Sequence, residues 1–200
     1  MIPAIVLAGG ASSRMGRLKP LLLAGNRTFV RRILDTLQSA GIADIVVVVR
    51  PGHHEVIAEV GAAGALSVVN SDPDAGQLSS LLAGLAALDV PEVDAVLVTL
   101  VDVPLVDTST VRALLTRAMK SPAPIVRAAH HGRHGHPVIF KRAVFDDLRH
   151  ADLSVGAKAV FRAFQVEDVE VDDPGVLEDV DTPADYERVT ESRSPRGPHG

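Results

Sequence analysis

Glycines, hydroxyl groups and cations are concentrated in one short stretch near the start of the chain, directly after an apolar run. Residues 7–19 read Leu-Ala-Gly-Gly-Ala-Ser-Ser-Arg-Met-Gly-Arg-Leu-Lys. Glycines allow the backbone to approach a phosphate closely, and neighbouring cations neutralise phosphate charge. The glycine spacing fits neither a Walker A loop nor the Gly-x-Gly-x-x-Gly dinucleotide fingerprint. From these residues alone, a triphosphate-binding loop and an ordinary glycine turn with solvated cations both remain open.

Two aspartates stand where a carboxylate could meet a metal ion. Asp102 follows the apolar run 95–100, and Asp181 lies in the Asp-Val-Asp-Thr-Pro segment 179–183. Mg²⁺ prefers carboxylate oxygens and water, usually beside substrate phosphates. The alternatives are a turn in which Asp102 bonds backbone amides, and a helix capped by Asp181. Asp179 competes with Asp181, because alternate residues of a strand point to opposite sides.

The segment 74–80 opens a predicted helix with three polar side chains. The amide of Gln77 and the hydroxyls of Ser79 and Ser80 could read a ribose or a base edge. Capping of the helix is the alternative for the same groups.

A stretch rich in His, Arg and Gly, residues 130–136, is predicted to form a turn between two strands. Its Arg133, His134 and His136 could bind an anionic acceptor, and an ordinary exposed turn is the alternative. The His spacing fits no standard zinc pattern, and the chain has no cysteine to complete one.

Strand and helix patterns alternate over the first 120 residues, and these elements must position the polar groups. Such alternation favours an α/β fold with a mainly parallel sheet and helices on both faces. Ligands of these sheets bind beyond the carboxyl ends of the strands, where the loop 8–19 and Asp102 are both expected. The patterns predict strands at 2–7, 45–49, 66–69 and 95–100, and helices at 28–40, 54–60, 77–88 and 108–119, the last one capped by Thr108 or Ser109.

The order of elements changes after residue 119. A single domain is expected over residues 1–190. Residues 191–200 form a polar stretch with no apolar side chain to bury, so a disordered tail is expected there. The later patterns predict strands at 125–129, 137–140 and 166–171, and helices at 142–149, 156–164 and from about Pro183 to 189.

Composition excludes several classes of protein. Of 200 residues, 46% are hydrophobic and only 3% aromatic, so aliphatic side chains must build the core. The net charge of -5 gives the chain no overall positive charge that would attract nucleic acid. The absence of cysteine excludes disulfides and thiol nucleophiles. The start lacks a basic signal-peptide region and no apolar run approaches the ~20 residues of a membrane span, so we expect a cytoplasmic protein without membrane contacts.

The loop 7–19 resembles the signature of sugar-nucleotide and cofactor nucleotidyltransferases, Leu-x-Gly-Gly-x-Ser-x-Arg-Met-Gly-x-x-Lys. Closer still, residues 2–189 resemble the MobA/MocA-like family of molybdopterin guanylyltransferases and cytidylyltransferases. The resemblance implies a single-domain, three-layer α/β/α Rossmann-like nucleotidyltransferase fold of the glycosyltransferase-A type, with a mostly parallel mixed sheet. The matching segments are Asp-x-Pro at 102–104, Gly-Gln-x-x-Ser at 76–80, Gly-His-Pro-Val-x-Phe at 135–140 and Asp-Thr-Pro-x-Asp at 181–185.

The resemblance also implies roles for residues of this chain. Lys19 and Arg14 would neutralise phosphate charge, and Asp102 and Asp181 would hold Mg²⁺, with Asp181 favoured over Asp179. The implied reaction is attack by the terminal phosphate of a molybdopterin-type cofactor on the α-phosphorus of CTP or GTP, with release of pyrophosphate. The implied nucleotide site consists of Leu7, Ala8, Gly9, Gly10, Arg14, Gly16, Lys19, Gln77, Ser79 and Ser80, and the acceptor site of Arg133, His134 and His136.

The nucleotide is not decided by the resemblance. Cytidylyltransferases more often carry Ala at the position of Gly9, so the glycine here resembles the guanylyltransferase loop. The segments 76–80, 135–140 and 181–185 resemble the cytidylyltransferase branch and favour CTP. Other readings stay open: a sugar-phosphate acceptor, a non-catalytic module that carries the cofactor to a molybdoenzyme, and a nicotinamide dehydrogenase, against which the missing dinucleotide fingerprint counts.

Overall fold

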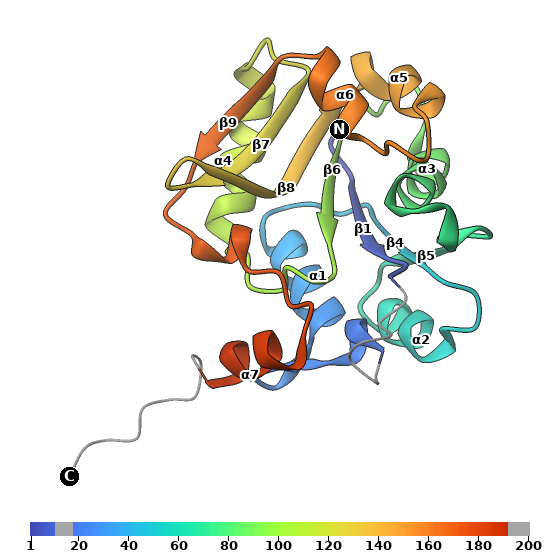
Figure 1. Ribbon diagram of the computed structural model, residues 1–200, viewed down its shortest axis with the longest axis vertical. Coiled ribbons are helices and arrows are strands. Elements are labelled where there is room, and N and C mark those ends of the chain that lie inside the picture. The colour runs from blue at the N-terminus through green and yellow to red at the C-terminus, as the bar shows by residue number, and fades with distance from the viewer. Residues whose placement is uncertain (11–17, 192–200) are drawn as a thin grey trace.

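The computed structural model describes residues 1–10 and 18–191, and these form one mixed sheet covered by helices (Figure 1). The seven strands of this sheet lie in the order β5-β4-β1-β6-β8-β7-β9. All neighbouring pairs are parallel except those that β8 makes with β6 and β7. The strands are β1 (Ala4–Ala8), β4 (Ile45–Val49), β5 (Leu66–Val69), β6 (Ala95–Leu100), β7 (Ile125–His130), β8 (Arg133–Lys141) and β9 (Val166–Glu170), and a separate small hairpin pairs β2 (Leu23–Ala24) with β3 (Arg27–Thr28).

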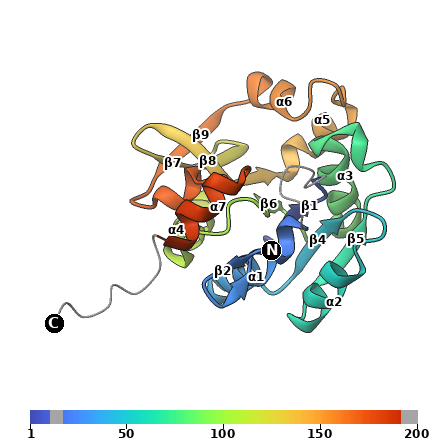
Figure 2. The same ribbon diagram turned by 60° about the horizontal axis from the view of Figure 1, so that its bottom comes forward.

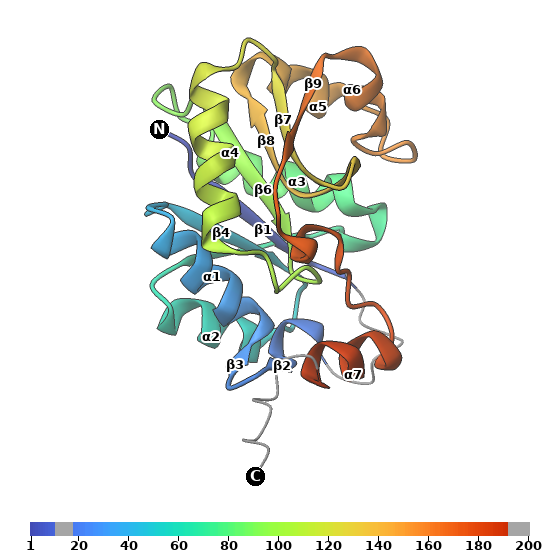
Figure 3. The same cartoon turned by 90° about the vertical axis from the view of Figure 1, so that its left-hand side faces the viewer.

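Helices cover both faces of the sheet, so the predicted three-layer α/β/α fold is confirmed (Figure 3). One face carries α1 (Phe29–Ser39), α2 (His54–Ala62) and α4 (Thr108–Lys120). The other face carries α3 (Gln77–Leu88), α5 (Phe145–His150) and α6 (Lys158–Ala163). The remaining helical elements are α7 (Pro183–Glu191) and the 3₁₀ turns η1 (Lys19–Leu21), η2 (Pro73–Ala75), η3 (Arg142–Val144) and η4 (Pro174–Leu177).

The central strand β1 shows why the sheet is buried on both faces. Its side chains alternate between two core clusters, with Ala4, Val6 and Ala8 facing α1, α2 and α4, and Ile5 and Leu7 facing α3, α5 and α6. All five residues are buried. A continuous apolar run is what a parallel strand between two helical layers requires, so the carboxyl end of β1 is held rigidly at the edge where the loop begins.

The edge formed by the carboxyl ends of β1, β4 and β6 is bordered by α7 (Figure 2), and Lys19 and Pro20 of η1 lie beside the same strand ends. Helix α7 packs there against α1, with the ring of Tyr186 centred 6.0 Å from that of Phe29. Segments from both ends of the described chain therefore meet beside the strand ends. None of the helices in the described part of the chain is both long and apolar enough to span a membrane.

The predicted turn at 130–136 is wrong for most of its length. Only His131 and Gly132 form the turn, and β8 already begins at Arg133. Both turn residues have positive φ, 50° and 70°. This backbone conformation matches the right-handed twist of the flanking strands, so two residues suffice to reverse the chain. His134 consequently pairs with Ala129 in a ladder instead of standing in a loop.

The predicted cap of the fourth helix is also wrong. Asp107, not Thr108 or Ser109, occupies the N-cap position, and its side chain makes no capping bond. The carboxylate of the distant Asp173 instead accepts hydrogen bonds from the Asp107 N–H at 2.8 Å and from the Thr110 hydroxyl at 2.6 Å. Tertiary packing thus replaces the local cap.

Candidate functional site

A cavity of about 450 Å³, here called the first cavity, opens at the carboxyl ends of β1 and β6. The structure brings together on its wall most of the residues that the sequence predicted to bind nucleotide or metal. Arg14 and Gly16 lie outside the described residues. The predicted residues on the wall are Leu7, Ala8, Gly9, Gly10, Lys19, Gln77, Ser80, Asp102 and Asp181.

Lys19 lies between two carboxylates in the first cavity. Its ammonium nitrogen donates a hydrogen bond to Oδ1 of Asp181 at 2.7 Å and lies 3.9 Å from Oδ2 of Asp102. The Lys19 side chain is only 13% exposed, because η1 begins at this residue and holds it against the strand ends. The geometry gathers one cation and two anions around a single point of the cavity wall.

The environment of Asp102 is unfavourable for its negative charge. Burial raises the pKa of its carboxyl from 3.8 to about 6, against the opposing charge of Lys19, and the carboxylates of Asp179 and Asp181 add to the rise. Oδ1 of Asp102 is buried and has no hydrogen-bond partner. A buried polar atom without a partner costs free energy, so this oxygen is poised to accept a cation or a donor supplied by a ligand.

These two carboxylates suit a hard divalent cation. Carboxylate oxygens are its preferred protein ligands, and the unpartnered Oδ1 of Asp102 is a free ligand atom. Within residues 1–10 and 18–191, no group of three or more His, Asp or Glu side chains is arranged to hold a metal ion. An ion bound by Asp102 and Asp181 would therefore complete its shell with phosphate oxygens and water.

The start of α7 explains why Asp181 can face Lys19. Thr182 and Asp185 form a reciprocal capping box, in which the Thr182 hydroxyl accepts from the Asp185 N–H at 3.2 Å and the Asp185 carboxylate accepts from the Thr182 N–H at 2.9 Å. Because these two residues cap the helix, the Asp181 side chain is not needed for that purpose. Asp179 lines a different cavity, and partial desolvation beside Asp181 raises its pKa.

A buried hydrogen-bond network stands behind the glycine loop. Asn70 donates through Nδ2 to the hydroxyls of Ser79 at 2.8 Å and Ser80 at 3.0 Å. Ser79 in turn bonds the backbone carbonyl of Gly76 and lines neither cavity. A Cβ on Gly9 would lie 2.9 Å from the Ser80 hydroxyl oxygen. The network therefore holds the Ser80 hydroxyl so close to the loop that a Cβ at position 9 would require this hydroxyl to move.

Sequence reasoning missed Arg50 in the first cavity. This residue directly follows β4. Ligands of such sheets bind beyond the carboxyl ends of the strands, and this expectation, which singled out Asp102, applies to Arg50 as well. Its guanidinium donates to the Gly9 carbonyl oxygen at 3.3 Å and to the Asp74 carboxylate at 2.8 Å. Arg50 thus ties the glycine loop to η2, which also lines the first cavity.

A larger cavity of about 860 Å³, here called the second cavity, adjoins the first and shares Leu7, Gln77 and Leu100 with it. The three predicted acceptor residues Arg133, His134 and His136 all line the second cavity. Its other walls come from α3, β6, β7, α6 and η4, from further residues of β8 and from the segment before α6. Sequence reasoning missed four of its residues, Arg127, Lys158, Phe161 and Arg162, because the pattern around them predicts only a strand and a helix.

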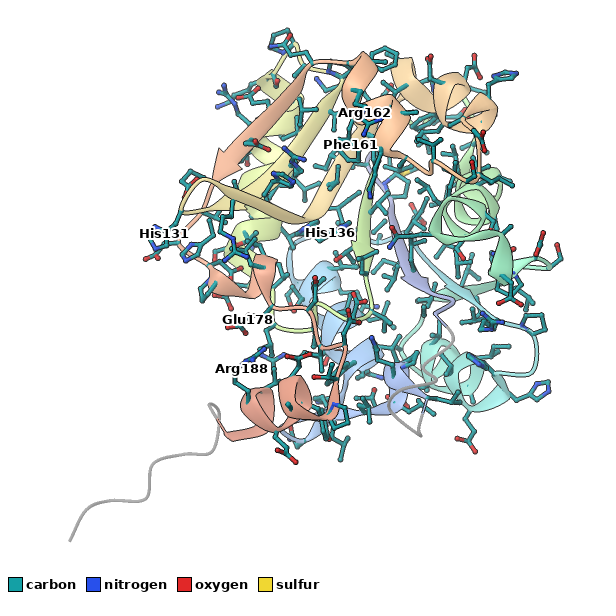
Figure 4. All side chains as sticks on the ribbon, viewed as in Figure 1. His131, His136, Phe161, Arg162, Glu178 and Arg188 are labelled. Atoms are coloured by element: carbon teal, nitrogen blue, oxygen red, sulfur yellow. The ribbon has the colours of Figure 1, made fainter. Side chains whose placement is uncertain are left out.

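His136 of β8, labelled in Figure 4, lines the second cavity and is held as a neutral ring. Burial lowers the pKa of His136 to about 4, although a hydrogen bond with the Val98 backbone acts in the opposite direction and the charge of Arg127 lowers the pKa further. Its Nδ1 atom is buried without a partner. The contact with Val98 therefore falls on the other ring nitrogen.

The sheet of this chain carries helices on both faces and a cavity at its strand ends. A glycine loop and a lysine between two aspartates line that cavity, as in a nucleotidyltransferase. This chain is an enzyme of that class. The family model described as MobA-like NTP transferase domain matches residues 4–169. The chain belongs to the MobA-like NTP transferase family.

Three comparisons illustrate the range of its relatives. Nicotine blue oxidoreductase from Paenarthrobacter nicotinovorans is 32% identical over 90% of this chain and 92% of its own length. Molybdenum cofactor guanylyltransferase from Rhizobium johnstonii is 32% identical over 68% of this chain and 61% of its own. The crystal structure of Rv0371c from Mycobacterium tuberculosis in complex with manganese superposes with a TM-score of 0.78 at 28% identity, covering 96% of this chain and 98% of that one.

Proposed function

We propose that this enzyme transfers a nucleoside monophosphate, CMP in preference to GMP, from the triphosphate to the phosphate of a molybdopterin-type cofactor. The observation that carries the proposal is Lys19, held between Asp102 and Asp181 in a cavity that adjoins a second, larger one. The first cavity would hold the triphosphate and the second would hold the acceptor. The molybdenum cofactor guanylyltransferase among the relatives supports this choice of acceptor.

The reaction needs positioning and charge neutralisation rather than a strong base. An oxygen of the acceptor phosphate forms a bond to the α-phosphorus, the bond from that phosphorus to the bridging oxygen breaks, and the electron pair leaves with pyrophosphate. Because the acceptor oxygen is already anionic, no proton has to be removed. Lys19 and Arg14 would neutralise the triphosphate, with Lys19 exchanging its carboxylate partners for phosphate oxygens.

Asp102 and Asp181 would hold a divalent cation, which we propose to be Mg²⁺. When bound, the ion neutralises charge along the triphosphate. The carboxylate ligands and the unpartnered Oδ1 of Asp102 support a hard cation. The manganese complex of Rv0371c, a protein of the same fold, supports a divalent metal at 28% identity.

The second cavity supports the acceptor role of Arg133, His134 and His136. All three line it although they belong to a strand and not to the loop that the sequence predicted. Arg133 and His134 are exposed and can reach a phosphate, whereas His136 stands deeper. A sugar phosphate is the alternative acceptor, and a molybdoenzyme that receives the product is the expected partner. The alternative to an enzyme is a binding protein that carries the cofactor and catalyses no reaction.

A pyrophosphate-release assay with CTP, GTP, ATP and UTP in turn, each with Mg²⁺ and with or without molybdenum cofactor, tests the proposal. Release should require both cofactor and metal and should be fastest with CTP. Lys19→Ala provides the catalytic control, and Lys120→Gln, which changes an exposed cation on α4, provides the structural control. Faster release with GTP would correct the nucleotide, and no release with any nucleotide, despite bound cofactor, would favour the carrier.

A second candidate function is favoured by one relative. Nicotine blue oxidoreductase shares 32% identity over nearly its whole length. An oxidoreductase with this fold would place a nucleotide cofactor in the first cavity and a flat substrate in the second. Following NADH and NADPH absorbance in the presence of quinonoid dyes separates the two functions, because nucleotidyl transfer leaves the nicotinamide absorbance unchanged.

A further inference from the structure

Asn70 is a buried amide that follows β5 directly, where the chain leaves the sheet on its way to η2 and α3 (Figure 1). The residue is only 4% exposed, and its backbone N–H donates to the Val49 carbonyl oxygen at 2.9 Å. It lines neither the first nor the second cavity. A side-chain amide carries two hydrogens to donate and one oxygen that accepts, so a buried one constrains the groups around it.

The orientation of the Asn70 amide is fixed by a backbone group. Its Oδ1 accepts a hydrogen bond from the Asp72 N–H at 3.0 Å. A backbone N–H can only donate, so the side-chain atom that faces it must be the oxygen and not the nitrogen. The two hydrogens on Nδ2 then go to the hydroxyl oxygens of Ser79 at 2.8 Å and Ser80 at 3.0 Å. Both serines are therefore obliged to accept from Asn70.

The two serines differ in where their own hydrogens can go. The Ser79 hydroxyl lies 2.8 Å from the carbonyl oxygen of Asp72 and 2.8 Å from that of Gly76, so its hydrogen has acceptors within the protein. The Ser80 hydroxyl accepts from Asn70 and makes no other hydrogen bond in the part of the chain that the structure describes. Its hydrogen is therefore still to be donated.

The surroundings of Ser80 make the first cavity the place for that acceptor. Ser80 lines this cavity, and a Cβ on Gly9 would lie only 2.9 Å from its hydroxyl oxygen, so the hydroxyl stands directly beside the glycine loop. Ser80 is 4% exposed, which leaves water little access to it. A buried hydroxyl hydrogen without an acceptor costs free energy. An oxygen of a bound nucleotide would remove this cost.

We propose that Asn70 is a positioning residue for the nucleotide. By donating to the Ser80 hydroxyl, it obliges Ser80 to present its hydrogen to the first cavity, where an oxygen of the nucleoside triphosphate accepts it. The inference rests on the proposed function, since that function places the triphosphate in the first cavity. Asn70 acts on the nucleotide only through Ser80.

Asn70→Asp reverses this direction with little change of shape. At pH 8 the introduced carboxylate can only accept, so it still takes the Asp72 N–H but draws the Ser80 hydrogen away from the cavity. Titration calorimetry of the full chain with CTP and Mg²⁺ should show binding weakened by about fivefold or more. Asn70→Ala should weaken binding less, because Ser80 can still turn its hydrogen toward the ligand. Asn26→Asp makes the same change at an exposed amide and should leave CTP affinity unaltered.

A double-mutant cycle separates positioning from a contribution to stability. Ser80→Ala alone should weaken CTP binding by about fivefold, because the donor is lost. Adding Asn70→Asp should then have no further effect, since no hydroxyl is left to direct. Equal losses with and without Ser80→Ala, a greater loss with Asn70→Ala than with Asn70→Asp, or no loss at all would each overturn the inference. If Asn70→Asp does not fold, the same cycle with Asn70→Ala decides.

Two further measurements identify the accepting oxygen and keep the result apart from the proposed function. If Ser80→Ala weakens inorganic tripolyphosphate as much as CTP, the hydrogen goes to a phosphate oxygen, and if only CTP is weakened, it goes to the ribose or the base. The expected cycle without pyrophosphate release in the presence of molybdenum cofactor would leave the role of Asn70 intact and refute the transfer. Transfer by the parent without coupling between Asn70 and Ser80 would refute only the inference, and a parent that binds no triphosphate would refute both.

Discussion

Replacing Asp102 by Asn should stabilise the ligand-free protein at neutral and alkaline pH. The pKa of the Asp102 carboxyl rises from 3.8 to about 6, chiefly through burial. Each pKa unit corresponds to about 1.4 kcal/mol, so the ionised carboxyl costs the folded state about 3 kcal/mol at pH 8. Asparagine keeps the shape of the side chain and removes its charge. The free energy of unfolding should therefore rise by up to about 3 kcal/mol.

The stabilisation should depend on pH in one direction. The folded state binds a proton at Asp102 more readily than the unfolded chain does, because the folded pKa is the higher one. The cost of the charge is therefore present above about pH 6 and is lost as the pH falls toward 3.8. The difference between variant and parent should be about half as large near pH 5 as at pH 8.

Urea unfolding of the parent, Asp102→Asn and the exposed control Asp44→Asn, at pH 8 and pH 5, measures this difference. Asp102→Asn should move the urea midpoint upward at pH 8 without changing the m value, and Asp44→Asn should not. The variant should also lose the stabilisation that Mg²⁺ and CTP give the parent. A lower midpoint at pH 8, or an equal gain at both pH values, would refute the electrostatic reasoning for Asp102.

Three further substitutions test other parts of the site and fold. Lys19→Ala should stay folded yet lower pyrophosphate release by at least about a hundredfold, because it removes a cation that meets the triphosphate. Gly9→Ala should reduce the CTP-induced rise in melting temperature, since its Cβ would lie 2.9 Å from the Ser80 hydroxyl oxygen, and adding Ser80→Ala should restore part of it. Gly135→Ala should cost about 3 kcal/mol or more of stability in urea unfolding, because its Cβ would lie 1.9 Å from the Val176 backbone oxygen.

Each of these outcomes can fail in an informative way. Near-normal turnover by folded Lys19→Ala would remove this residue from the mechanism. A Gly9→Ala defect that Ser80→Ala does not relieve would point to the loop backbone instead of the Ser80 contact. Parental stability of Gly135→Ala would show that η4 can move away from β8 at little cost.

Local pattern was sufficient for most of the fold. The apolar run 2–7 became β1, which begins two residues further along the chain, at Ala4–Ala8, the runs 45–49 and 95–100 became β4 and β6, and the segment 77–88 became α3 at the predicted bounds. Periods of two and 3.6 residues act between close neighbours in sequence, so they are readable without the tertiary structure. The expectation failed at 130–136, because a two-residue turn with positive φ at His131 left no visible mark in the sequence.

By itself, the sequence determined that a glycine loop and Asp102 follow buried strands, and therefore that both lie at one edge of the sheet. Only the tertiary structure decided that Lys19 meets Asp181 across 162 positions of the chain, and that Asp179 faces the other cavity. It alone also gathered the α6 cations beside His136. Contacts of this kind depend on how distant helices and strands pack, and on which neighbour caps α7, so no local spacing in the sequence encodes them.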